Sequence, residues 1–392
     1  MREKRVGLWQ GSKVILVFLF VGIIFLPWQG YSEEAIKIGV IRDLTGPHAE
    51  AGRSQRDALT MVYDEANATG FIPGHKIDYK DTIGDEKADP DKSTSLAKKF
   101  IEADNVLLIS CCSTSGAGMA VVKAASEAKV PVTGHAYSTE LHKGELGKWY
   151  FASGSNNDEI APAWLEQVKR DGHKKVAVGW VNYAWGRDIR DNLLKRAADY
   201  GITIVGDVPI EMGASEATAE VQKIKALNPE AVIFCLLSKD QAAAARGVAA
   251  IGWNIPIYGT SATMPPALKM VGADLMEGWR APFLSDPAAT EVVAIINKFK
   301  TKYGSTPAEI TYFMETWDAT NVLMQVFKTM AEKKEPFTRT NLRDALEKYS
   351  AGVSLLTPTP RKSPGWKQVP HILIYAKDFL PLKVEKGKFA KY

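Results

Sequence analysis

Cysteine is scarce in this 392-residue sequence, which contains only Cys111, Cys112 and Cys235. No two cysteines have the CxxC spacing of zinc or dithiol sites, and the six histidines show no metal-ligand spacing. These absences argue against a zinc centre and against redox chemistry. A disulfide between the adjacent Cys111 and Cys112 would be strained, so we expect the cysteines to be small buried side chains near strand ends.

The motifs of several common enzyme classes are also missing. The sequence has no GxSxG elbow, and no GxGxxG or GxxxxGK[ST] follows the first expected strand, where a nucleotide-binding fold would carry it. Ser113, His135 and Asp240 would supply the atoms of a Ser-His-Asp triad, but we expect Asp240 on the far side of a cleft from the other two. We therefore predict a non-enzymatic protein without cofactor or metal, and keep a hydrolase as the remote alternative.

A strong excess of charge of one sign is absent from most of the chain. The formal charge is +4, but Arg2, Lys4, Arg5 and Lys13 against Glu3 place a net +3 within the first 32 residues. Without that segment the charge is +1, which gives no sign of a nucleic-acid partner.

The first 32 residues have the pattern of a secretory signal peptide. A basic start precedes the apolar run Val14–Pro27, and Gly30 and Ser32 offer small residues for cleavage before Glu33. The run is shorter than the roughly 20 residues that a spanning helix needs, so we favour cleavage over an uncleaved anchor. We predict residues 1–32 as signal peptide and a periplasmic mature protein.

From Glu34 onward, short β-rich runs alternate with helical patterns. The expected strands are Ile36–Ile41, Ile77–Asp81, Val106–Ser110, Val130–Thr133, Val176–Trp180, Ile202–Val208, Ala231–Leu237 and Ile257–Gly259. In the first helical pattern, His48–Ala68, the apolar Ala58, Leu59, Val62 and Ala66 fall on one face. Alternation of apolar strands with helices predicts an α/β fold with parallel sheets covered on both faces.

The pattern indicates two such sheets. A composition break at Phe151–Asp158 separates the first series from a second that begins at Val176. Helical patterns return over Ala288–Tyr303, Ile310–Met330 and Arg339–Tyr349, and a Pro-rich stretch leads to an expected late strand, His371–Tyr375.

Ligands of open α/β sheets bind beyond the carboxyl ends of the strands. This rule selects five places, which are Asp43–Gly46 with Ala49–Gly52, Ser113–Ser115, His135–Tyr137, Tyr183–Gly186 and Ser238–Asp240. Ser113, Thr114 and Ser115 open a helix, where they would bind a carboxylate or simply cap the helix. Trp185 would line an apolar pocket, and Asp240 would hold an ammonium group or only favour its helix dipole.

At these places the sequence resembles the leucine/isoleucine/valine-binding branch of type I periplasmic binding proteins. The resemblance covers about Ile36 to Tyr392, and its clearest segments are IKIGVIRDLTGPHAEAGRSQRDAL, DPDKSTSLAKKFIEADNVLLI, Cys111–Leu141, VNYAWGRD and IKALNPEAVIF. It implies two Rossmann-like lobes joined by a three-segment hinge, with lobe 1 over 34–153 plus 283–356 and lobe 2 over 154–282 plus 357–392. It also implies a monomer that delivers a small molecule to the membrane permease subunits of an ABC importer. A periplasmic sensor input is another class that remains open.

The resemblance further assigns ligand-binding roles. Ser113–Ser115 would grip a carboxylate, Ala136 and Tyr137 would form a second grip with the His135 carbonyl, Trp185 would close the pocket, and Asp240 would receive an ammonium. Four positions depart from the family pattern: Tyr137 replaces the usual Thr, Ala51 a frequent aromatic, Asp240 a Glu and Trp185 a Tyr. We therefore expect a branched-chain or other hydrophobic amino acid, with an aromatic acid, an amide or urea as alternatives.

Overall fold

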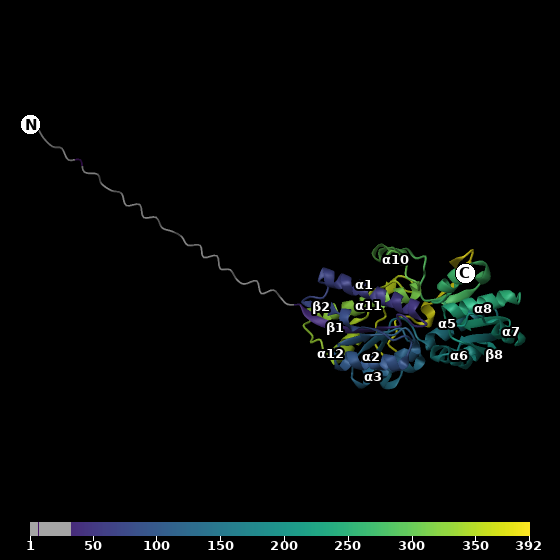
Figure 1. Cartoon of the computed structure of the whole chain (residues 1–392), viewed down its shortest axis with the longest axis horizontal. Coiled ribbons are helices and arrows are strands. Elements are labelled where there is room, and N and C mark those ends of the chain that lie inside the picture. Colours follow the sequence, from purple (N-terminus) through teal and green to yellow (C-terminus); the bar gives the residue numbers. More distant parts are fainter. Residues whose placement is uncertain (1–6, 8–32) are drawn as a thin grey trace, which may run out of the picture. The chain divides into compact units, whose positions relative to one another are not determined.

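The computed structural model describes residues 33–392 and Gly7, so the predicted signal peptide lies outside the described residues. Two sheets organise residues 33–392 (Figure 1). No helix of this described part is long and apolar enough to cross a membrane.

The first sheet is parallel and has the strand order β2-β1-β4-β5-β6, with β3 also paired to β1. Its strands are β1 (Glu34–Arg42), β2 (His75–Asp78), β3 (Ile83–Asp85), β4 (Leu108–Ser110), β5 (Val132–Gly134) and β6 (Tyr150–Ala152). The central strands are almost fully buried, as expected for a sheet with helices on both faces.

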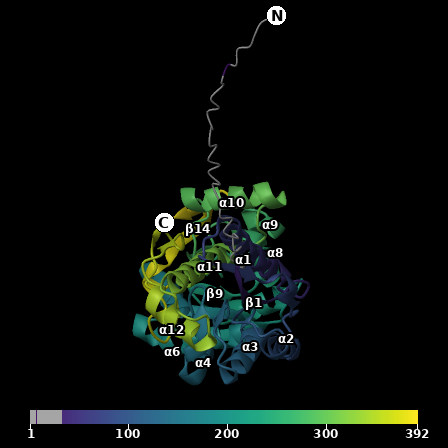
Figure 2. The same ribbon diagram turned by 90° about the vertical axis from the view of Figure 1, so that its left-hand side faces the viewer.

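The helices that pack on this sheet come from two separate parts of the chain. They are α1 (Ala49–Thr69), α2 (Pro90–Glu102), α3 (Ser115–Glu127), α4 (Gly144–Trp149), α10 (Thr290–Tyr303), α11 (Ile310–Glu332) and α12 (Arg339–Tyr349). Helix α1 lies beside α11, and α2 lies beside α3 (Figures 1 and 2). Helices α10 to α12 follow the parallel strands of the second sheet in sequence, yet their apolar side chains join the core of the first.

The second sheet has the order β15-β14-β11-β10-β9-β7-β8. Its parallel strands are β7 (Lys175–Val181), β8 (Thr203–Ile210), β9 (Ala231–Cys235), β10 (Ile257–Tyr258) and β11 (Arg280–Phe283). Two antiparallel strands, β14 (Leu380–Glu385) and β15 (Lys388–Lys391), extend its edge. Its helices are α5 (Asn157–Arg170), α6 (Ala184–Arg196), α7 (Thr218–Ala226), α8 (Ser238–Ala250) and α9 (Met264–Val271).

Shorter elements complete the chain. They are the hairpin β12 (Ser354–Leu355) and β13 (Arg361–Lys362), and the 3-10 turns η1 (Lys80–Thr82), η2 (Thr139–His142), η3 (Ala197–Tyr200), η4 (Asp274–Met276) and η5 (Ala376–Asp378).

The predicted α/β class with two lobes and three crossings is confirmed. The chain passes between the sheets after β6, after β11 and before β14. The exact lobe boundaries stay a prediction. Trp366 and Leu373 pack in the core of the first sheet, which favours placing the last crossing nearer to Phe379 than to residue 357.

The expected strand His371–Tyr375 is wrong, because this segment is irregular. Ile372, Leu373 and Ile374 are buried, but the N–H groups of Leu373 and Ile374 both donate to the Gly154 carbonyl instead of pairing in a ladder. A short buried apolar run has the composition of a strand whether or not a neighbour is available to pair with it.

The expectation for the cysteines is half right. All three are fully buried, and Cys235 is free, but Cys111 and Cys112 form a disulfide with each other. They lie at the end of β4, where the Cys111 N–H donates to Thr133 and the His135 N–H donates to the Cys111 carbonyl. We expected strain to disfavour this bond, and on that point the expectation is wrong.

Candidate ligand-binding site

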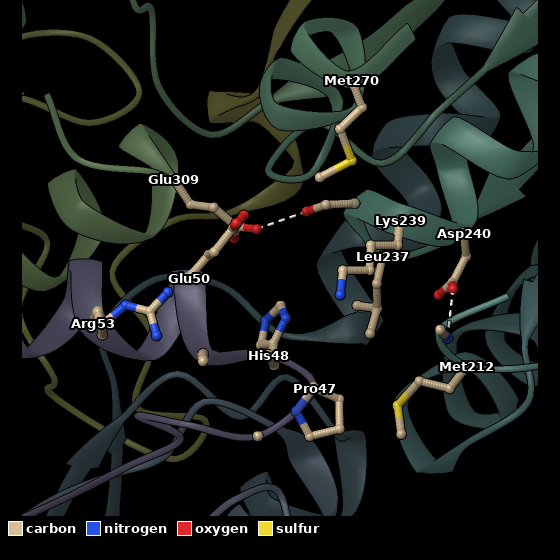
Figure 3. Close-up of a pocket in the computed structure, with 14 residues that line it drawn as sticks. Pro47, His48, Glu50, Arg53, Met212, Leu237, Lys239, Asp240, Met270 and Glu309 are labelled. Atoms are coloured by element: carbon tan, nitrogen blue, oxygen red, sulfur yellow. Dashed lines mark hydrogen bonds between the residues drawn. The ribbon is translucent and has the colours of Figure 1, made fainter. Parts of the chain in front are cut away.

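A pocket opens between residues of the two sheets, and we call it the polar pocket (Figure 3). It contains about 740 Å³ of space, part of which is open to solvent. One wall is Gly46–Glu50 with Arg53 and Glu309, and the other is Met212, Gly213, Leu237–Asp240 and Met270.

The first wall is shaped by the turn between β1 and α1. Asp43 is fully buried, and its carboxylate accepts hydrogen bonds from the N–H groups of Gly46 at 2.5 Å and His48 at 2.8 Å. At Gly52 an added Cβ would lie 1.8 Å from the Asp43 carbonyl oxygen, so only glycine lets α1 approach this turn. The turn thereby brings His48 and Glu50 to the pocket.

Glu309, just before α11, completes the first wall. Its N–H donates to Ser54 Oγ at 3.1 Å, and Ser54 Oγ in turn donates to the Glu50 carbonyl, so Glu309 is anchored on α1. The pKa of Glu309 is raised to about 8, mainly by burial and to a smaller extent by the negative charge of the nearby Glu50. Burial lowers the pKa of His48 to about 4, so its imidazole is neutral at pH 7.

The second wall begins where β9 ends. Ser238 Oγ on this wall donates a hydrogen bond across the polar pocket to Glu309 Oε1 at 2.6 Å. Asp240 Oδ1 accepts from the Gly213 N–H at 2.6 Å, and burial raises the pKa of Asp240 to about 6. Asp240 was predicted from the sequence, and it lies on this wall.

A second space, which we call the apolar cavity, is more enclosed, and only about 20 Å³ of it is accessible to the centre of a water molecule. It is lined by Tyr137, Ile160, Trp164, Trp185, Thr260–Ala262, Pro282, Leu284, Tyr312 and Phe379. The two predicted aromatics, Tyr137 and Trp185, therefore face one space. Tyr312 stacks near Tyr137 with ring centroids 6.5 Å apart and meets His48 of the polar pocket edge-on at 5.5 Å.

Trp185 and Tyr137 are each held by a polar partner. Trp185 Nε1 donates to Asn157 Oδ1 at 3.0 Å. Tyr137 Oη donates to Glu315 Oε2 at 2.7 Å, and His135 Nε2 lies 2.8 Å from the same oxygen. All three members of this cluster, His135, Tyr137 and Glu315, are buried.

The other predicted residues line neither space. Ser113 Oγ accepts from the Asp43 N–H and donates to Gln55 Oε1, and Thr114 caps α3 through the Ala117 N–H. Both backbone groups of Ala136 bond to the Tyr150 hydroxyl. Ser115 and Ala51 are buried beside them, Ala51 in the same apolar cluster as Tyr137. The ligand roles of these residues stay predictions.

The arrangement gives no support to a triad. His135 faces Glu315, Ser113 is bonded to Gln55, and within residues 33–392 no hydrogen bond joins Ser113 to His135.

Sequence reasoning gave no ligand role to several residues of the two spaces, above all His48, Glu50, Glu309 and Tyr312. The first two lie in or beside a strand-end loop that the strand-end rule did select. Glu309 and Tyr312 carry no local signal, because they follow the second sheet and return to the first only in the folded chain.

Two α/β halves with a pocket between them define a bilobal binding protein. The family model for periplasmic binding proteins matches residues 35–370, so the chain belongs to that family. A Leu/Ile/Val-binding protein of Rhizobium johnstonii is 25% identical over 267 residues, which are 68% of this chain and 71% of that relative. The resemblance to the leucine/isoleucine/valine-binding branch is thus confirmed.

Solved structures show the same fold. A branched chain amino acid ABC transporter protein from Thermus thermophilus with bound valine matches with a TM-score of 0.80 at 17% identity, over 92% of this chain and 96% of that one. A solute-binding protein from R. palustris in complex with benzoate matches with a TM-score of 0.75 at 20% identity, over 91% and 95% of the two chains.

Proposed function

We propose that this protein is the periplasmic substrate-binding component of an ABC importer and encloses one small solute between its two lobes. The observation that carries the proposal is the polar pocket, whose two walls come from the two sheets. A solute that contacts both walls stabilises the closed arrangement over an open one, which is the change that a hinge between lobes permits.

We propose a branched-chain or other hydrophobic amino acid as the solute. The apolar cavity offers aromatic and aliphatic side chains to an apolar group, and the polar pocket beside it offers carboxyl groups to an ammonium. The names of relatives agree with this class, since the Rhizobium protein is called Leu/Ile/Val-binding and the Thermus structure holds valine.

An aromatic acid is the second candidate. Tyr137, Trp185 and Tyr312 all line the apolar cavity, and such rings stack well on an aromatic solute. The R. palustris structure with benzoate is a relative in fold whose ligand has this chemistry. Small amides and urea remain alternatives that need no apolar group.

Other parts of the proposal follow from the family and the sequence. The chain is exported through a cleaved signal over residues 1–32, acts as a monomer, docks on permease subunits, and binds its solute without turnover.

The test is a thermal-shift screen of the mature protein, residues 33–392, followed by calorimetry on every hit. The panel holds L-leucine, L-isoleucine, L-valine, L-phenylalanine, benzoate, small amides and urea. A ligand at a hundredfold excess over Kd stabilises the native state by about 2.7 kcal/mol. One-to-one binding of aliphatic amino acids supports the first candidate, binding of benzoate alone replaces it with the second, and no binding across the panel refutes both.

A further inference from the structure

Two buried carboxyl groups on opposite walls of the polar pocket each have an oxygen without a partner. Glu309 is 1% exposed and Asp240 is 0% exposed. Glu309 Oε1 is bonded to Ser238 and Asp240 Oδ1 to Gly213, but Glu309 Oε2 and Asp240 Oδ2 have no hydrogen-bond partner among the described residues. Both residues line the pocket, and Figure 3 shows their carboxyl groups facing its interior.

An unpartnered buried carboxyl oxygen destabilises a fold by about 1–3 kcal/mol, and more when it is charged. Among the described residues, no side chain that lines the pocket pairs with these oxygens. The charged and titratable side chains near Glu309 are Tyr312 and the pocket residues His48, Glu50, Arg53, Lys239 and Asp240. In the described part of the chain neither Arg53 nor Lys239 forms an ion pair, and the Arg53 guanidinium donates instead to the Leu44 carbonyl.

The surroundings make the need for a cation stronger. Glu50 belongs to the same wall as Glu309 and is close enough to disfavour its ionisation. Two adjacent acids cannot both ionise cheaply unless a positive group lies between or beside them.

The geometry favours an organic cation over a metal ion. Nowhere in residues 33–392 do three or more His, Cys, Asp or Glu side chains gather in a way that could hold a metal. An ammonium group needs fewer charged partners than a metal ion, because its three N–H donors can be shared between carboxyl groups and nearby hydroxyls.

We propose that Glu309 is a specificity-determining residue, which accepts a hydrogen bond from a positively charged nitrogen of the solute. This inference rests on the proposed function and narrows it to solutes that carry an amine.

The direct test compares solutes that differ only in the amine. The probe pairs are L-leucine with 4-methylpentanoate and L-phenylalanine with 3-phenylpropanoate, each titrated by calorimetry into wild type, Glu309→Gln and the control Glu216→Gln, whose side chain is exposed. We expect Glu309→Gln to weaken binding of the amine-bearing member at least tenfold, since a hydrogen bond to a charged group is worth about that much. The Kd of the deaminated member for Glu309→Gln should change less than about twofold, and so should the Kd of either member for Glu216→Gln.

A third variant separates contact with the solute from contact between the lobes. Ser238→Ala removes the hydrogen bond across the polar pocket but leaves Glu309 in place. It should weaken both members of a pair, because it removes a contact between the two walls, and in contrast to Glu309→Gln the deaminated member should be weakened too.

Proton release gives a second readout. Because burial raises the pKa of Glu309 to about 8, the group is largely protonated at pH 7 before a cation arrives. Binding of an amine should therefore release protons, seen as a binding enthalpy that depends on the ionisation enthalpy of the buffer. Glu309→Gln should reduce this release.

The outcomes separate the inference from the proposed function. Equal loss for both members of a pair, or no loss, in Glu309→Gln overturns the role of Glu309 while solute binding stands. Wild-type protein that binds benzoate or 4-methylpentanoate but no amine also overturns it and leaves a carboxylate-binding protein. Wild-type protein that binds no probe refutes the proposed function, and the inference falls with it.

Discussion

The Tyr137 hydroxyl provides a sharp test of how the site is built. The family resemblance predicts that Tyr137 grips the solute, yet its hydroxyl donates to Glu315 Oε2 at 2.7 Å inside a buried cluster. If this bond is the hydroxyl's role, Tyr137→Phe removes one hydrogen bond to a buried carboxyl group and leaves His135 as the remaining partner of that oxygen. The ring, which lines the apolar cavity, is unchanged.

The magnitude follows from that single contact. Hydrogen bonds to charged groups contribute about 1.5–3 kcal/mol net, and Glu315 Oε1 already lacks a partner within residues 33–392. We expect the free energy of unfolding to fall by about 2 kcal/mol, and Tm to fall by roughly 4 °C for a chain of this size. Affinity for the solute should change less than about threefold.

The assay is urea unfolding followed by tryptophan fluorescence, combined with calorimetric titration of the best solute. Tyr303→Phe is the matched control, because the Tyr303 side chain is 39% exposed on α10. Unchanged stability together with a tenfold loss of affinity would refute the reasoning, since the hydroxyl would then serve the solute and not Glu315.

Three further predictions address other parts of the chain. Trp185→Ala should weaken solute binding more than tenfold, or about 1.4 kcal/mol, and unchanged affinity in calorimetry of the folded variant would remove Trp185 from the site. Maleimide labelling in denaturant should find one thiol, Cys235, before reduction and three afterwards; three before reduction would contradict the Cys111–Cys112 disulfide. Burial raises the pKa of Glu86 to about 7, above its unfolded value, so stability from this group is full below about pH 4.5 and is lost as pH rises through 7. Urea midpoints from pH 5 to 8 should therefore decline less in Glu86→Gln than in wild type, and parallel declines would contradict the assignment.

The strand-end rule found part of the lining of the two spaces because it follows from sheet geometry. It selected the turn after β1, which does reach the polar pocket, and it selected Asp240 after β9. It also selected Tyr137 and Trp185, which come from different lobes and line the same cavity. These residues could be found because each follows a strand whose apolar pattern is plain in the sequence.

The same rule could not tell which way a side chain points. Ser113 ends β4 as predicted, but its hydroxyl turns toward Asp43 and Gln55, two residues of the β1–α1 segment. The choice between solute and protein partners depends on distances of a few tenths of an ångström between segments far apart in sequence. No pattern within the Ser113–Ser115 run carries that information.

Glu309 illustrates a different limit. Its neighbours show helical periodicity, but the periodicity does not say which sheet the helix covers. Only the contact of α11 with α1 places Glu309 beside Glu50.

One face of α11 then explains why an amine and an apolar group would be recognised together. Glu309, Tyr312 and Thr316 stand three and four residues apart, so they lie along one side of the helix. Glu309 faces the polar pocket, Tyr312 faces the apolar cavity, and Thr316 Oγ1 lies 3.4 Å from His135 Nδ1 of the buried cluster. Because the rings of His48 and Tyr312 meet edge-on, the two spaces adjoin at this aromatic contact. A solute with its charged nitrogen and its apolar group a few bonds apart would reach both sides of that contact, whereas benzoate has no amine and would leave Glu309 without a partner.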